Sequence, residues 1–163
     1  MIQPLFNYTH QYNNLYGNCT QTNMPALYTC KNYTEFNSEK TDFFVKQGEH
    51  ALPYLNQILL YSKNEYQLTE TLYILNKMLD NGTKNIDKMY YSLSRLNNIN
   101  SPYIQTFLAG IYRKTQVPDA FGPLVSMLIK NSLCNNTNTN FDPNEEIGGA
   151  ILSYISDRFR NQT

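Results

Sequence analysis

Residues 101–114 read SPYIQTFLAGIYRK and predict one amphipathic helix with a well-marked start. Ser101 is a residue type that caps helix N-termini, and Pro102 stands at the first helical position, where its missing N–H costs no hydrogen bond. Ile104, Leu108 and Ile111 recur at helical spacing and share one face. Similar stretches precede and follow this one, so the rest of the chain is compared with it.

Apolar stripes of the same kind recur at regular intervals. A preceding stripe, shifted by 36 positions, comprises Leu68, Leu72 and Leu75, and a following stripe, shifted by 43 positions, comprises Ile147, Ile151 and Tyr154. Shorter apolar stretches lie between them. The spacing predicts an all-α fold of helix pairs near residues 49–62 and 65–80, 85–97 and 102–114, and 120–132 and 143–159. From the shared register we expect Leu72, Leu108 and Ile151 to be fully buried.

Local signals mark where these helices begin and end. Thr41 and Asp42 are expected to start the first helical stretch, and Gly48 to interrupt it. Asn64 with Gln67 forms a start resembling a capping box. The next helix is expected to end at Asn81-Gly82, and the last to begin within Asp142-Pro143-Asn144-Glu145.

Composition divides the chain into two parts and limits its partners. Residues 1–40 are rich in Tyr and Asn and show no regular period, whereas residues 41–163 form the predicted helical domain. Lys and Arg together number 13, as do Asp and Glu, so the net charge is zero. A general attraction to nucleic acid or to anionic membranes is therefore not expected.

The helix pairs resemble a known class of repeats. The stretch Ala51-Leu-Pro-Tyr-Leu-Asn-Gln-Ile-Leu59, followed after a polar turn by residues 68–79, is similar to HEAT and armadillo-like repeats, and so is Gly122-Pro123-Leu-Val-Ser-Met-Leu-Ile129. The resemblance covers about three units over residues 45–160. It departs from the family in lacking the usual Asp in the turn and Arg in the second helix, where Tyr66, Gln67 and Tyr103 stand.

The resemblance implies a short α-solenoid, a superhelix of antiparallel helix pairs, with an irregular N-terminal segment. It also implies a curved surface, lined by the second helices, that binds proteins, peptides or occasionally nucleic acid. An irregular all-helical bundle stays open as the alternative architecture. The positions off the apolar stripe include Glu70, and among them we expect the partner-binding residues to be Tyr73, Lys77, Gln105, Tyr112 and Arg113. Of these, Tyr73, Lys77, Tyr112 and Arg113 are expected to be exposed on one surface. The alternative is a solvated helix face with cations near helix C-termini.

No pattern in the sequence predicts catalysis, a metal site or a cofactor. Glu145 and Glu146 are explained by capping of a first helical turn, and Gly148 and Gly149 by close helix packing. The two histidines, His10 and His50, lack a recognisable nucleophile nearby in the sequence, and Cys19, Cys30 and Cys134 form no C-x-x-C pair. A disulfide between Cys19 and Cys30 is conceivable only in an oxidising compartment.

The predicted function is therefore a non-catalytic protein–protein interaction module, a scaffold or adaptor whose partner is a protein or peptide. The alternative is a helical-repeat protein that binds or processes nucleic acid, which zero net charge disfavours. A hydrolase or lyase with residues assembled from distant positions also stays open. No apolar run approaches the ~20 residues of a membrane helix, and residues 1–8 lack the features of a signal peptide. We expect a soluble, cytoplasmic protein without a membrane partner.

Overall fold

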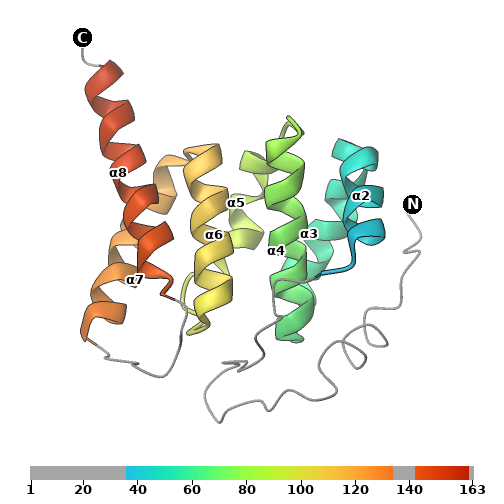
Figure 1. The fold of residues 1–163 in the computed structure, drawn as a ribbon, viewed down its shortest axis with the longest axis horizontal. Coiled ribbons are helices and arrows are strands. Elements are labelled where there is room, and N and C mark those ends of the chain that lie inside the picture. Colours follow the sequence, from blue (N-terminus) through green and yellow to red (C-terminus); the bar gives the residue numbers. More distant parts are fainter. Residues whose placement is uncertain (1–35, 134–141, 162–163) are drawn as a thin grey trace.

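The computed structural model describes residues 36–133 and 142–161, and these residues form helices and no strand (Figure 1). The all-α prediction is confirmed. The α-helices are α2 (Ser38–Gln47), α3 (Leu52–Tyr61), α4 (Glu65–Asp80), α5 (Tyr90–Ser94), α6 (Pro102–Thr115), α7 (Phe121–Leu133) and α8 (Asn144–Asn161). Short 3-10 turns lead into α3, α5 and α7, and comprise η1 (Gly48–Ala51), η2 (Ile86–Met89) and η3 (Pro118–Ala120). The predictions for His10 and the three cysteines lie outside the described residues.

The helices are arranged in two layers. In one layer α4 packs against α2 and α6, and α6 packs against α8, so these helices follow one another in chain order. Helices α3, α5 and α7 lie behind this row, with α3 contacting both α4 and α5, and α7 contacting α8 (Figure 1). The short polar connections between successive helices favour this antiparallel packing of neighbours.

The first helix begins earlier than the sequence predicts. Asn37 caps α2, and its side-chain oxygen accepts a hydrogen bond from the Lys40 N–H at 2.9 Å. Thr41 lies inside the first turn, where its hydroxyl donates to the carbonyl of Asn37 at 3.0 Å. Asparagine and threonine both cap helix N-termini. Asn37 is the cap here because its side chain accepts from the backbone N–H of Lys40, whereas the Thr41 side chain bonds to a carbonyl. Gly48 then ends α2 with φ of 57°, as predicted.

The predicted starts at Asn64, Ser101 and Asp142-Pro143-Asn144-Glu145 and the predicted end at Asn81-Gly82 are confirmed. The side chain of Asn64 accepts from the Gln67 N–H at 3.1 Å, and that of Ser101 accepts from the Ile104 N–H at 3.4 Å. Helix α4 ends at Asp80, just before Asn81-Gly82. At the start of α8, the carboxylate of Asp142 accepts from the N–H of Asn144 at 2.9 Å. The helix predicted over residues 85–97 is wrong in its length, because η2 and the short α5 end at Ser94 and turns follow.

The core prediction holds for two of its three residues. Leu72 and Leu108 are fully buried, but Ile151 is only half-buried. Among the described elements, helix α8 is the last of the row and packs mainly on α6 and α7, so its buried stripe is narrow. That stripe runs through Ile147 and Ala150, and leaves Ile151 at its edge.

The contact between α4 and α6 depends on a glycine and a buried amide. A Cβ atom at Gly110 would lie 2.8 Å from Oδ1 of Asn76, so only glycine fits without movement. Asn76 donates through Nδ2 to the carbonyls of Leu72 and Phe107, at 3.0 and 2.9 Å, and accepts from Lys114 at 3.1 Å. By contrast, nothing lies within 4 Å of a Cβ at residues 148 or 149, so the expectation that these glycines permit close packing is wrong.

Candidate functional site

The predicted partner-binding residues do not form one exposed surface. Tyr73 and Lys77 do lie together on α4, where the Lys77 ammonium is 5.5 Å from the centre of the Tyr73 ring. Lys77 is exposed, whereas Tyr73 is half-buried because its ring packs on those of Phe36 and Phe107, at 4.9 and 5.8 Å between centres. Both line a hollow of about 400 Å³ between α2 and α4.

Tyr112 and Gln105 are buried, so the expectation that Tyr112 is exposed is wrong. The Tyr112 hydroxyl donates to Oδ1 of Asn97 at 2.6 Å, and its ring lies 5.7 Å from that of Tyr90. Burial raises the pKa of the Tyr112 hydroxyl above its ordinary value. The error arises because α6 packs on α4 and α8, and the Tyr112 ring packs on Tyr90 of α5, so α6 buries more than the single stripe that its sequence shows.

Arg113 and Glu70 are engaged with neighbouring helices. The Arg113 guanidinium is exposed, and its Nε lies 3.1 Å from a carboxylate oxygen of Glu146 on α8. Glu70, expected off the core stripe, is fully buried in an ion pair with Lys40 of α2. Desolvation lowers the pKa of Lys40 to about 8 and raises that of Glu70, while their mutual attraction opposes both shifts. These carboxylates tie helices together.

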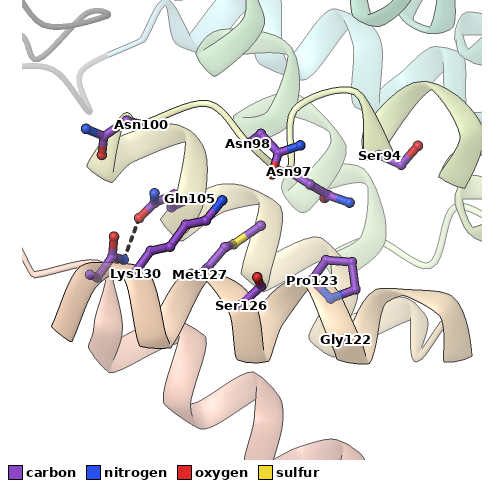
Figure 2. A pocket seen from close by; sticks show the side chains of 11 residues that line it. Ser94, Asn97, Asn98, Asn100, Gln105, Gly122, Pro123, Ser126, Met127 and Lys130 are labelled. Carbon is purple, nitrogen blue, oxygen red and sulfur yellow. Dashed lines mark hydrogen bonds between the residues drawn. The ribbon is translucent and has the colours of Figure 1, made fainter. Parts of the chain in front are cut away.

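A larger pocket of about 500 Å³ lies between α7 and the turn that joins α5 to α6. Helix α5 ends at Ser94 after five residues, and the chain crosses to Ser101 through turns, whereas the adjacent α7 runs for 13 residues. The short helix leaves part of α6 uncovered beside α7. We call this the amide pocket; its lining residues are Ser94, Asn97, Asn98, Asn100, Gln105, Gly122, Pro123, Ser126, Met127, Lys130 and Asn131 (Figure 2).

Hydrogen bonds to neighbouring helices hold the base of the amide pocket in place. Asn131 of α7 donates through Nδ2 to Oε1 of Gln105, at 2.7 Å (dashed line in Figure 2), and to Oδ1 of Asn144 on α8, at 3.0 Å. Gln105 and the apolar side chain of Met127 are both buried beneath the opening. The base of the pocket is thus formed before any ligand arrives.

The rim of the amide pocket carries hydrogen-bonding groups that the protein leaves unfilled. The Tyr112 hydroxyl donates to Oδ1 of Asn97, whereas the NH₂ of Asn97 donates to no described residue. The side chains of Asn98, Asn100 and Ser126 form no hydrogen bond with any described residue. Each Asn amide offers two donors and an acceptor. The rim therefore presents donors and acceptors together, which suits a ligand that carries both.

Lys130 is the single ionisable side chain that lines the amide pocket. No His, Cys, Asp or Glu lines the pocket, and Lys130 forms no hydrogen bond with Ser94 or Ser126, the two hydroxyl groups of the described lining. Within residues 36–133 and 142–161, no group of three or more His, Cys, Asp or Glu side chains is placed to hold a metal ion.

The chain was also compared with known proteins and searched for membrane-spanning helices. Searches of family models, of curated proteins and of solved structures found no match to this chain. In the described part of the chain, no helix combines the length and the apolar character needed to cross a bilayer.

Sequence reasoning identified one lining residue, Gln105, and missed the rest. Asn97, Asn98 and Asn100 stand between two predicted helices, where a cluster of asparagines indicates only a turn. The early end of α5 is what brings that turn alongside α7. Tyr112, predicted to contact a partner, instead orients Asn97 from behind the pocket.

Proposed function

We propose that this chain is a non-catalytic protein-interaction module that binds an extended peptide segment of its partner in the amide pocket. The observation that carries the proposal is the set of unfilled donors and acceptors on the rim, contributed by Asn97, Asn98 and Asn100. A peptide main chain offers one donor and one acceptor at nearly every residue, which matches amide side chains. A base held by Asn131 and Gln105 reduces the ordering cost of binding.

The lining favours a peptide over a nucleic acid or a sugar. Single-stranded nucleic acids bind through stacking of bases on aromatic rings and through several cations. None of the residues that line the amide pocket is aromatic, and Lys130 is its one cation. Met127 and Pro123 supply an apolar contact that adapts to different side chains.

The proposed architecture is a short α-solenoid of antiparallel helix pairs, of the HEAT and armadillo-like kind. Its support is the chain-ordered row of α4, α6 and α8, together with contacts between α3 and the segment around α5 in the other layer. The Ser92 hydroxyl donates to Oδ1 of Asn56 at 2.6 Å, and Arg95 donates to the carbonyl of Leu59, each pair being 36 positions apart. The proposed binding face lies on the layer formed by α3, α5 and α7, the first helices of the pairs. The surface expected from the sequence was that of the second helices, which includes Lys77 on α4.

The test fills the amide pocket without disturbing the fold. Gly122 is exposed in the first turn of α7, lines the pocket, and has no atom within 4 Å of where its Cβ would lie. Gly122→Tyr therefore places a ring in or over the opening. Gly149→Tyr is the matched control, because Gly149 is equally open and helical but lies on α8, outside the pocket.

Random heptapeptides displayed on phage are panned against the whole chain, and the best peptide is titrated by fluorescence anisotropy. We expect Gly122→Tyr to weaken its binding by about tenfold or more, equivalent to about 1.4 kcal/mol. Gly149→Tyr should bind like the wild type. Equal binding by both variants would place the peptide elsewhere and refute the pocket, and failure to select any peptide would refute the proposed function.

A further inference from the structure

One wall of the amide pocket is a straight line of residues on α7. Gly122, Ser126 and Lys130 follow one another at four-residue intervals, so they lie one above the next on the same side of the helix. Eight residues of α-helix span roughly 12 Å. An extended chain advances roughly 3.3 Å per residue, so three to four residues of a peptide cover this wall.

The facing wall is the turn between α5 and α6. Ser94, Asn97, Asn98 and Asn100 follow the opposite edge of the pocket, and Gln105 lies between the walls (Figure 2). The unfilled amide groups on this side are placed to pair with a main chain that runs along α7. Gly122 has no side chain, which lets the main chain approach the helix closely at that end.

The pocket has a charge only at one end of the α7 wall. Lys130 is exposed, forms no ion pair with a described carboxylate, and extends from α7 towards the turn that carries Asn98 (Figure 2). No carboxylate lines the pocket to neutralise it. A cation in the last turn also complements the dipole of α7. That effect accounts for a positive charge near the helix end, but it leaves the ammonium free to bind an anion.

We infer that the amide pocket selects extended peptides with one acidic side chain, whose carboxylate pairs with the ammonium of Lys130 while main-chain groups pair with the asparagines. This inference rests on the proposed function, since it names the chemistry of the peptide bound there. An ammonium is a compact point charge without the fork geometry of arginine. Both aspartate and glutamate are therefore accepted, at one position of the peptide. The opposite end of the wall, at Gly122, carries no such preference.

The test is an array of random hexapeptides, acetylated and amidated to remove terminal charges. It is probed with the wild-type chain, with Lys130→Met, which keeps the apolar stem, and with Lys88→Met, which removes an exposed lysine of η2 outside the pocket. Wild type and Lys88→Met should select peptides with Asp or Glu enriched at one position. In Lys130→Met that enrichment should vanish, with an unchanged circular dichroism spectrum.

The best acidic peptide and its Glu→Gln or Asp→Asn analogue then give the size of the effect. We expect the wild type to prefer the acidic form by about tenfold at low salt, as for a charge-assisted hydrogen bond, and the preference to shrink as salt is added. Lys130→Met should bind both forms alike.

The outcomes separate this inference from the function on which it rests. Peptides that bind in the pocket, as judged by their loss in Gly122→Tyr, but show no acidic preference would overturn the inference alone. The same holds if Lys130→Met still prefers the acidic form. Peptides that bind Gly122→Tyr as well as the wild type, or an array with no binding at all, would overturn the proposed function and the inference together.

Discussion

Asn76 and the asparagines of the amide pocket carry the same side-chain group in different surroundings. Asn76 is buried between α4 and α6, and bonds to two carbonyls and to Lys114. Asn98 and Asn100 stand at the rim of a pocket and bond to no described residue. These bonds satisfy the Asn76 amide, which burial would otherwise leave unpaired. The amides of Asn98 and Asn100 keep their donors and acceptors available to a ligand.

The difference shows that a residue type alone does not reveal a binding site in this protein. What matters is whether neighbouring helices have already used the hydrogen-bonding capacity of the side chain. Where the long helices α4 and α6 pack side by side, the hydrogen-bonding groups of Asn76 are all used. Where α5 stops after five residues, the capacity is left over.

The largest difference between the two regions should appear in stability. Leu108 of α6 is fully buried between the layers, so Leu108→Ala should cost about 2–5 kcal/mol of unfolding free energy. Ser126 is exposed at the pocket, and Ser126→Ala should change that free energy by no more than about 0.5 kcal/mol. Urea denaturation of both variants measures the contrast. Similar losses would show that the pocket wall is part of the packed core.

A smaller effect is expected where Gly110 meets Asn76. Gly110→Ala brings a methyl group against the Asn76 amide and should cost about 1–3 kcal/mol. In an Asn76→Ala background the methyl group has room, and the higher helix propensity of alanine should make the same change neutral or stabilising. Gly149→Ala, with open space around it, should be stabilising by about 0.5–1 kcal/mol and is the control. Additive costs in this double-mutant cycle would contradict the close contact.

The smallest effect concerns the carboxyl group of Glu65. Both carboxylate oxygens of Glu65, in the first turn of α4, are buried without a hydrogen bond among the described residues, and burial raises the pKa of this group to about 7. Its favourable contribution is complete below the ordinary pKa of 4.5 and is lost as the pH rises through 7. Because Glu65 as a whole residue is only half-buried, solvent screens part of this effect, and we expect about 1–2 kcal/mol less stability at pH 8 than at pH 5.

Glu65→Gln isolates that contribution. The amide does not titrate, so the variant should lose most of the difference in melting temperature between pH 5 and pH 8. Lys40, whose pKa is lowered to about 8, and Glu70, whose pKa is raised, also contribute to the pH dependence, but they are present in both proteins. The difference between wild type and variant therefore gives the contribution of Glu65. An unchanged pH dependence in Glu65→Gln would show that the carboxyl is solvated.

The helices could be predicted because their signals are local. The caps Asn64 and Ser101 and the ends at Gly48 and Gly82 act within a few residues of themselves, and the apolar stripes repeat at the helical period. The failures are of a different kind. Ile151 is half-buried because α8 has no further helix on its outer side among the described elements, a fact that its own sequence does not contain.

The candidate site could not be predicted in the same way. Tyr112 and Arg113 are adjacent in sequence and both lie off the apolar stripe, yet one is fully buried and the other exposed. Which of them faces a neighbour depends on how α6 is placed between α4 and α8. The pocket depends on the difference in length between α5 and α7 and on the path of the turn between α5 and α6.

The chain-ordered row of helices also bears on how the protein folds. The side-chain bonds of Asn76 to α6 join residues 31 and 38 positions apart. The contact between α4 and α6 therefore forms by closing a short loop of the chain. The entropy lost in closing a loop rises with its length, and chains with mostly local contacts fold quickly. The pair α4 and α6 can therefore form before the chain beyond it is ordered, and α8 then adds to a surface that already exists.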